Sequence, residues 1–534
     1  MLEDPTAIVY VNARVRTGDE ARPTAHGLRV AAGRVTHVFE GAPPAGATGG
    51  VVDLGGATIL PGLVDAHLHL RGIGQAAREL DLRGTRSIDE IVTRVREAAS
   101  SAPAGTWIRG RGWDQNDWAV QAFPTRAPLD TAAPEHLVWL TRVDGHAAWV
   151  NGRALALAGV NGATPGPEGG EILHDDRGEP TGVLVDNAIT LVERQLPEPS
   201  EDELAADLAR GMGLVAQSGL TGVHDMAVPA RTLAVLRAMD QRAELTVRVT
   251  VYFDGSDPAL AELLRVPPER DGLLRVVGVK LFADGALGSR GAALLAPYSD
   301  RLESSGLLVV EPDVLRERAA AVHAAGYQLA IHAIGDRGNR VALDAIEAAE
   351  GADRSRRHRI EHAQVVALDD IPRFASLGVA ASMQPTHATS DMPWVEARVG
   401  AERIRGAYAW RSMLRAGVPL ALGSDAPVEG ENPWWGIHAA VTRQDASAMP
   451  AGGWRAEERL TLDEAIEGFT RAPARAVGDA DLGVIRAGAR ADLTIVAEDP
   501  WALSPGALRG VATLRTLVDG REVWVRGEAS GRAR

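Results

Sequence analysis

The chain has 534 residues, no cysteine and a formal net charge of −15, from 56 Lys and Arg against 71 Asp and Glu. The acidic residues are spread along the chain, which argues against nucleic acid or an anionic membrane as a partner, because both need clustered Lys and Arg. The lack of cysteine excludes disulfides, zinc–thiolate sites and cysteine nucleophiles. A transition metal would therefore be held by histidine, carboxylate or a less usual ligand.

The N-terminal stretch MLEDPTAIVYVNARVRTGDE does not resemble a secretory signal. It lacks a basic start, a long apolar run and a small-residue cleavage site. No segment approaches the roughly 20 apolar residues of a membrane span. We therefore expect a cytoplasmic protein with a small-molecule substrate and no membrane partner, and we leave a homodimer open as its assembly.

Both ends of the chain alternate apolar and polar residues between glycine turns, as in AIVYVNARV and VATLRTLVDGREVWVRG. This alternation is typical of β-strands. We predict that residues 1–60 and 478–534 together form one composite β-sandwich domain. The stretch GARADL (488–493) is interpreted as a turn of that domain and not as a phosphate loop.

The centre of the chain, residues 61–477, predicts an α/β fold, a (β/α)₈ TIM barrel. Short β-branched runs alternate there with longer amphipathic stretches such as 313–326 and 368–378. Strand and helix alternating eight times is the pattern of this barrel. The eight runs lie at 62–70, 219–226, 245–254, 276–285, 327–336, 357–364, 378–385 and 419–427.

The segment between the first two runs is far longer than a βα unit requires. It contains the aromatic-rich stretches WIRGRGWDQNDW (107–118) and LVWLTRVDGHAAWVNGRAL (137–155). We predict an inserted subdomain at about residues 71–215, on the catalytic side of the barrel.

Histidines stand at the ends of several predicted strands. In PGLVDAHLHL (61–70), Asp65, His67 and His69 share one face of the strand. Alone, they fit a half-exposed strand as well as a pair of metal ligands. Similar strand ends hold His332, His362 and Asp425, and because the carboxyl ends of barrel strands meet on one face, we expect these side chains to converge.

Lys280 lies inside the fourth run, VVGVKLFADG, where an unpaired ammonium is costly to bury. It could pair with Asp284 or Asp336. Alternatively, burial lowers its pKa, and the neutral amine reacts with CO₂ to give a carbamate whose carboxylate can bridge two cations.

Taken together, several motifs resemble those of the amidohydrolase superfamily, within it the YtcJ-like amidohydrolase-3 family, which includes N-substituted formamide deformylases. The motifs are PGLVDAHLHL, VKLFADGALGSRGA, IHAIGDRGN, IEHAQ, SMQPTHATSDM and GSDAPVE. The resemblance implies a metal-bearing barrel with a composite β-sandwich. It implies that His67, His69 and Asp425 bind one metal, that His332 and His362 bind a second, and that Lys280 bridges them as a carbamate.

We therefore expect a metal-dependent hydrolase of non-peptide carbon–nitrogen bonds, acting on a small amide or formamide. Two metals would lower the pKa of bound water and polarise the carbonyl, with zinc as the expected metal and manganese, iron or cobalt as substitutes. Asp425 would carry the proton to the leaving amine, although an aspartate in GSDAP could also cap a helix.

Other residues are expected to play supporting roles. Asp65 would orient a ligand histidine or cap a turn. His146, His387, Arg290 and Trp113 would contact the substrate, with Trp118 and Trp149 completing an apolar wall or simply packing the insert. A single-metal deaminase and a non-catalytic binding or regulatory relative remain as alternatives, although HAIGDRGNR lacks the glutamate typical of deaminases.

Overall fold

A central barrel of eight parallel strands organises the molecule. The computed structural model describes residues 7–45, 47–351 and 353–527. Each of the eight predicted runs overlaps one strand of the barrel, which confirms the predicted fold class. In barrel order the strands are β8 (Leu63–Leu68), β15 (Leu220–Val228), β16 (Arg248–Asp254), β17 (Leu274–Phe282), β18 (Gln328–Ala333), β19 (Arg359–His362), β20 (Ala380–Met383) and β21 (Leu420–Leu422).

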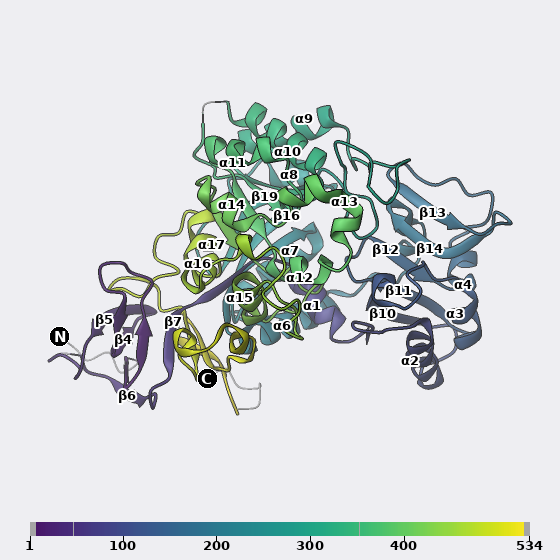
Figure 1. The fold of residues 1–534 in the computed structure, drawn as a ribbon. Coiled ribbons are helices and arrows are strands. Elements are labelled where there is room, and N and C mark those ends of the chain that lie inside the picture. The colour runs from purple at the N-terminus through teal and green to yellow at the C-terminus, as the bar shows by residue number, and fades with distance from the viewer. Residues whose placement is uncertain (1–6, 46, 352, 528–534) are drawn as a thin grey trace.

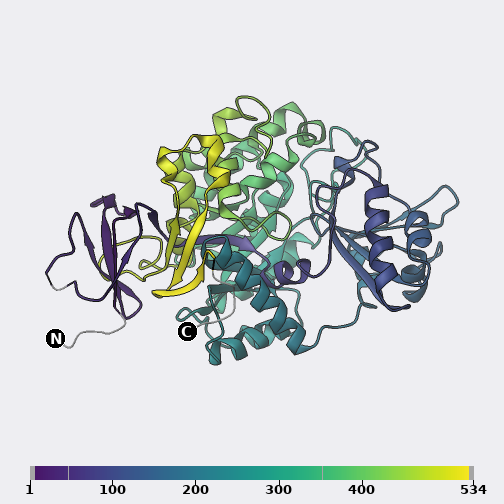
Figure 2. The same ribbon diagram turned by 90° about the horizontal axis from the view of Figure 1, so that it is seen from below.

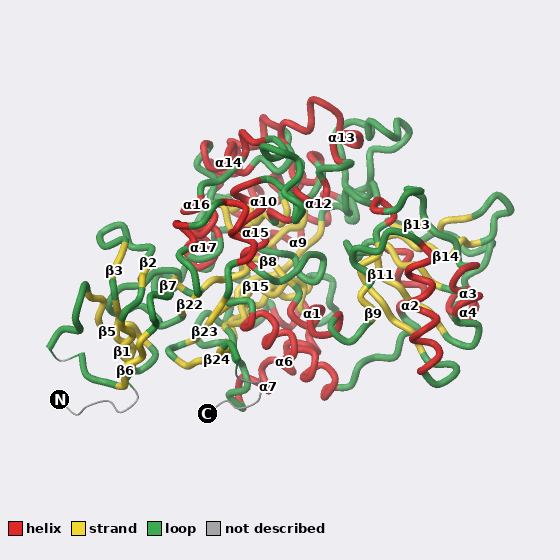
Figure 3. The backbone as a smooth tube through the Cα atoms, turned by 60° about the horizontal axis from the view of Figure 1, so that its bottom comes forward, coloured by secondary structure: helices red, strands yellow, loops and turns green. Residues whose placement is uncertain are grey.

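Helices surround these strands (Figures 1 and 3). Helix α6 begins at a capping box of Ser200 and Glu203, and α11 ends at Gly378, whose φ of 67° favours glycine. The helices of the barrel region are α1 (Leu70–Ala76), α6 (Glu201–Gln217), α7 (Ala230–Gln241), α8 (Leu260–Leu263), α9 (Pro312–Ala324), α10 (Asp336–Glu350), α11 (Ile371–Leu377), α12 (Pro385–Asp391), α13 (Val395–Arg403), α14 (Trp410–Arg415), α15 (Pro433–Thr442), α16 (Leu462–Gly468) and α17 (Arg471–Ala476).

A second, six-stranded sheet lies between β8 and β15 in the chain. Its order is β13 (Gly170–His174), β14 (Pro180–Asp186), β12 (Ala147–Val150), β11 (Leu137–Arg142), β10 (Trp107–Trp113) and β9 (Leu80–Asp81). Strands β9, β10 and β11 are parallel, and the other neighbours are antiparallel. The helix α2 (Ile88–Ser101) and the shorter helices α3 (Ala127–Ala132), α4 (Gly152–Leu157) and α5 (Thr190–Glu193) accompany this sheet.

Two further sheets lie on the opposite side of the barrel from that insert (Figure 2). One is β5 (Arg34–Phe39), β4 (Gly27–Ala31), β1 (Ile8–Val11) and β6 (Gly50–Asp53). The other joins both ends of the chain, in the order β24 (Arg521–Val525), β23 (Thr513–Val518), β22 (Leu493–Val496), β7 (Thr58–Pro61), β2 (Arg14–Arg16) and β3 (Thr24–Ala25). Residues 1–6 and 528–534 of the predicted sandwich lie outside the described residues.

The two terminal sheets share an apolar core. Tyr10 and Leu28 of the first sheet pack in one cluster with Ile59, Leu493 and Leu517 of the second. A polar link ties the C-terminal strands to the barrel, because Arg248 in β16 donates to both carboxylate oxygens of Asp492 at 2.9 and 3.0 Å and to Asp519 at 2.9 Å. The barrel is therefore in direct contact with the sheet that joins both ends of the chain.

Candidate metal centre

Three of the predicted ligands meet around Asp425. This residue follows β21, and its carboxylate lies 3.4 Å from Nε2 of His67 and 3.2 Å from Nε2 of His69. The strand end approaches β8 closely, because a Cβ on Gly423 would stand 2.5 Å from Asp65 and 2.6 Å from the amide of His67. The φ of Asp425 is 60°, so its backbone holds a strained conformation that aims the carboxylate at the histidines.

The other three predicted ligands lie against the first group. The ring of His362 is 4.7 Å from that of His67 and 4.6 Å from that of His332, centroid to centroid. Nζ of Lys280 is 3.5 Å from Nε2 of His67. The structure thus brings all six residues together at the carboxyl end of the barrel.

Burial sets the protonation state of this cluster. Desolvation lowers the pKa of His67, His332 and His362, the latter two far below the usual range of histidine. Burial alone would raise the pKa of Asp425, but the neighbouring histidines hold it well below its ordinary value. Neutral imidazoles beside an ionised carboxylate are the forms that bind metal ions.

The donor set fits a divalent metal. Ligand atoms of His67, His69 and Asp425 all lie within 4.8 Å of one another, and so do those of His362, His387 and Asp425. Within the described residues, the buried Oδ1 atom of Asp425 has no hydrogen-bond partner. The second group contains His387, whereas Nε2 of His332 faces the carbonyl of Gly285 at 3.5 Å.

Lys280 is a buried lysine in β17. Desolvation lowers the pKa of its ammonium to about 8. No carboxylate of the described residues forms an ion pair with it. Asp284 instead accepts the backbone N–H groups of Ala293, Ile334 and Gly335, so the alternative pairing weighed from the sequence does not occur with Asp284.

A buried glutamate orients His67. Oε2 of Glu361 lies 2.6 Å from Nδ1 of His67, both side chains being fully buried, and Arg359 pairs with the same carboxylate. Sequence reasoning proposed Asp65 for such a role, but Asp65 accepts the backbone N–H groups of His67 and Ser424. Contacts of this kind fix the tautomer and the direction of a ligand ring.

A cavity of about 920 Å³ opens above the cluster, between the barrel and the insert. Lys280 and Asp425 line it from the barrel, and His146 and Arg142 line it from the insert. The insert residues that line it lie at or just after the carboxyl ends of β9, β10 and β11, so two sets of parallel strands point their carboxyl ends at one space.

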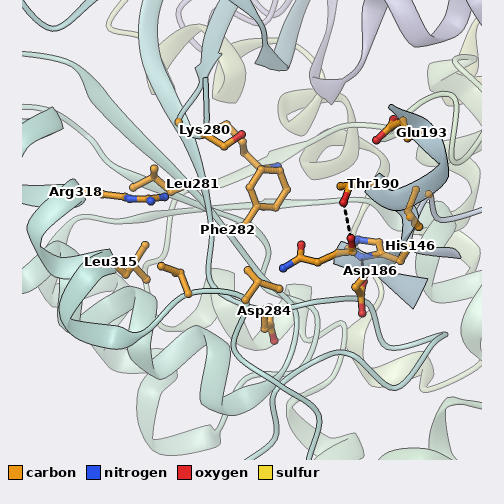
Figure 4. A pocket seen from close by; sticks show the side chains of 17 residues that line it. His146, Asp186, Thr190, Glu193, Lys280, Leu281, Phe282, Asp284, Leu315 and Arg318 are labelled. Atoms are coloured by element: carbon orange, nitrogen blue, oxygen red, sulfur yellow. Dashed lines mark hydrogen bonds and ion pairs between the residues drawn. The ribbon is translucent and has the colours of Figure 1, made fainter. Parts of the chain in front are cut away.

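A smaller cavity of about 400 Å³ lies beside the first and shares His146, Lys280 and Phe282 with it. Figure 4 shows these side chains with Asp186, whose carboxylate is 2.7 Å from Nδ1 of His146. Burial would lower the pKa of His146, but Asp186 raises it above the usual value. His146 thus stands near the predicted ligands, with its ring 5.7 Å from that of His332.

The four predicted substrate-contacting residues lie in different places. His146 and His387 line the larger cavity. Arg290 does not; it donates to Asp300 at 2.7 Å. Trp113 is fully buried in the insert, where it packs against Trp118 and Trp149. Sequence reasoning missed Glu361, Gln384 and Arg111: the Oε1 atom of Gln384 lies 2.9 Å from Nδ1 of His362, and Arg111 lines the larger cavity.

Comparison with known proteins identifies relatives across nearly the whole chain. The amidohydrolase family matches residues 50–524. The putative amidohydrolase YtcJ of Bacillus subtilis is 34% identical, with 89% of this chain and 90% of that protein covered. N-substituted formamide deformylase of Arthrobacter pascens is 30% identical over 96% of this chain and 97% of that protein. An uncharacterised metal-dependent hydrolase from Pyrococcus horikoshii has a TM-score of 0.78 and 28% identity, covering 94% and 99%.

Proposed function

Because this chain belongs to the amidohydrolase family, we propose that it hydrolyses the carbon–nitrogen bond of a small amide or N-substituted formamide. The observation that carries the proposal is the meeting of the side chains of His67, His69 and Asp425 beneath a cavity. The formamide activity in the name of one relative supports the choice of substrate class.

In this proposal His67, His69 and Asp425 would hold one divalent metal, and His332 and His362 a second. Zinc is our first candidate, with manganese, iron or cobalt as substitutes. When bound, such metals polarise a carbonyl and lower the pKa of water. Lys280 would stand between them as a carbamate: its neutral amine forms a bond to the carbon of CO₂ and releases one proton.

The chain's own residues would then supply the proton transfers. A carboxylate oxygen of Asp425 accepts a proton from the attacking water and returns it to the nitrogen of the leaving amine, so that cleavage of the carbon–nitrogen bond gives a neutral amine. Glu361 keeps the proton of His67 on Nδ1, which leaves Nε2, the atom that faces Asp425, unprotonated. His146 and His387 lie where they can contact the substrate.

Elemental analysis of freshly purified protein, combined with an amide and formamide panel assayed for released amine, tests the proposal. About two metal equivalents with amine release support it. About one equivalent with ammonia release from amino-substituted rings favours a single-metal deaminase. No metal and no turnover after metal is supplied would favour a binding protein.

A further inference from the structure

Arg111 is a cavity-lining cation that the described residues leave largely without partners. It lies near the end of β10, and its Nη2 atom donates to the carbonyl of Val143 at 3.0 Å. Its Nε atom is buried without a hydrogen-bond partner, and among the described residues it forms no ion pair within 4 Å. A guanidinium has five N–H donors, so most of this group's capacity is unused.

Its neighbours place the guanidinium at the metal side of the cavity. A Cβ added to Gly145 would lie 3.8 Å from its Nη2 and 3.9 Å from its Nη1, so the guanidinium lies close to the backbone just before His146. Burial lowers the pKa of Arg111, and Asp425 is the strongest of the charges that oppose this shift. The ring of His146, the residue after Gly145, lies 5.7 Å from that of the predicted ligand His332, centroid to centroid.

Other cavity-lining arginines already have partners. Arg83 donates to both carboxylate oxygens of Asp81 at 2.9 Å. Arg142 pairs with Asp114 and Asp144 and also donates to Gln115 at 2.8 Å. Arg509 stacks on Trp435, with its guanidinium carbon 4.5 Å from the ring. Arg111 therefore differs from these three in having neither an ion pair nor an aromatic partner among the described residues.

We propose that Arg111 binds a carboxylate of the substrate, so that the enzyme acts on amides whose amine half carries a carboxylate. The inference rests on the proposed function and is drawn for its formamide substrates, because the formyl carbon carries only a hydrogen and a carboxylate must therefore stand on the amine half. The planar fork of arginine matches a carboxylate in a bidentate geometry. The guanidinium, which has no ion-pair partner among the described residues, gains a counterion when such a substrate enters.

A matched substrate pair tests this charge requirement. N-formyl-4-aminobutanoate and its neutral analogue N-formyl-4-aminobutanamide differ only in the terminal group. We expect the metal-loaded wild type to show a kcat/KM at least about tenfold higher for the carboxylate, in line with a charge-assisted hydrogen bond. Arg111→Gln should abolish that preference mainly through a higher KM, because a remote contact is the same in ground and transition states.

Variants and binding measurements keep the test decisive. Arg111→Lys should retain part of the preference, and the controls Arg83→Gln and Arg509→Gln should leave the ratio of the two rates unchanged. Equal rates for both substrates in the wild type, or a preference that persists in Arg111→Gln, overturn the inference while leaving the proposed function intact. If neither compound is hydrolysed, the proposed function is in question, and calorimetric binding of both compounds to wild type and Arg111→Gln decides the inference separately.

Discussion

At the scale of single residues, the charge balance inside the barrel governs the metal centre. Arg359 crosses the barrel interior, donating to the carbonyl of Ala66 at 2.6 Å and to the carboxylate of Glu361. Glu361 in turn accepts a hydrogen bond from the Nδ1–H group of His67. Arg359 and the neighbouring His67 keep the pKa of Glu361 far below its ordinary value despite burial. His67, the predicted ligand, is thus held by a fixed negative charge.

We predict that Glu361→Gln weakens metal binding by about 10–100-fold, the usual effect of removing a partner of a ligand histidine. Titration of the metal-free protein against a competing chelator measures the affinity, and circular dichroism verifies the fold. Glu350→Gln is the matched control, because Glu350 is also buried beside an arginine, Arg354, but lies in α10 away from the cluster. Unchanged affinity in Glu361→Gln would contradict the assigned orienting role.

We predict that Lys280→Ala removes one of two bound metals and abolishes hydrolysis, because alanine offers no amine for CO₂. Added acetate or propionate should restore part of the activity by placing a carboxylate in the vacated space. Elemental analysis and amine release measure the two effects, with wild type plus the same acid as the control. Full metal content in the variant, or no rescue at high acid concentration, would argue against a bridging carbamate.

Most of the cluster was predictable from spacing, because parallel barrel strands deliver the residues at their carboxyl ends to one face. The position of Glu361 was not predictable. Neighbouring residues of a regular strand face opposite sides, so the placement of His362 in the cluster implied that Glu361 points away from it. The φ of 73° at His362 breaks that alternation and lets both residues serve the site. The positions of Arg290 and Trp113 relative to the cavity depend on the shape of a loop and on the packing of the insert, which sequence spacing alone does not encode.

At the scale of secondary-structure elements, His358 joins two strands and a helix. Its Nδ1 atom accepts the backbone N–H of Leu329 in β18 at 2.9 Å, and its Nε2 atom lies 3.0 Å from Nδ1 of His323 in α9. Because Nδ1 accepts a hydrogen bond, the ring is neutral with its proton on Nε2. A second proton would have to bind Nδ1, where it would face the N–H of Leu329. Burial of the ring lowers the pKa of His358 to about 3.

This histidine makes folding sensitive to acid. The unfolded chain takes up a proton near pH 6.5 and the folded chain only near pH 3, so stability is lost as the pH falls through that window. The loss is about 1.4 kcal/mol per pH unit at most. We predict that His358→Asn, which keeps an acceptor but does not titrate, flattens the decline in unfolding free energy between pH 6.5 and 4.5. Urea unfolding at several pH values measures it, and an unchanged slope would contradict this assignment.

The strand-and-helix order of the barrel was predictable because its apolar runs are short, regular and separated by helices. The insert sheet was not predicted in detail. Its strands β10 and β11 run parallel to each other, and the direction in which they point relative to the barrel is a tertiary property that no local pattern encodes. That direction is what brings Arg111 and His146 to the cavity.

At the scale of the whole molecule, the C-terminal strands are joined to the barrel by a buried ion pair. Arg248 and Asp492 are 3% and 4% exposed at their side chains, whereas Asp519, the second partner of Arg248, is 31% exposed. Strand β22 also pairs with β7, so residues from opposite ends of the chain lie in one sheet beside the barrel. No helix among the described residues is both long and apolar enough to cross a membrane.

We predict that Asp492→Asn lowers the free energy of unfolding by about 3 kcal/mol, because it leaves the buried guanidinium of Arg248 short of a counterion. Asp519→Asn, the matched control, should cost at most about 1 kcal/mol, because that carboxylate is partly exposed. Urea unfolding at pH 7 measures both, and turnover per folded molecule should not change. Equal effects of the two substitutions would contradict the importance of burial here.

The barrel strands and the insert strands face each other across one cavity, and the two parts have different tasks. The barrel holds the groups proposed for bond cleavage, and the insert contributes the opposite wall, including Arg111 and His146. A substitution on the insert wall can therefore alter which compounds are accepted while leaving the ligands beneath it in place. Relatives with the same barrel could acquire different substrate specificities through substitutions in β10 and β11 alone. The design of a new hydrolase on this scaffold would begin with those two strands.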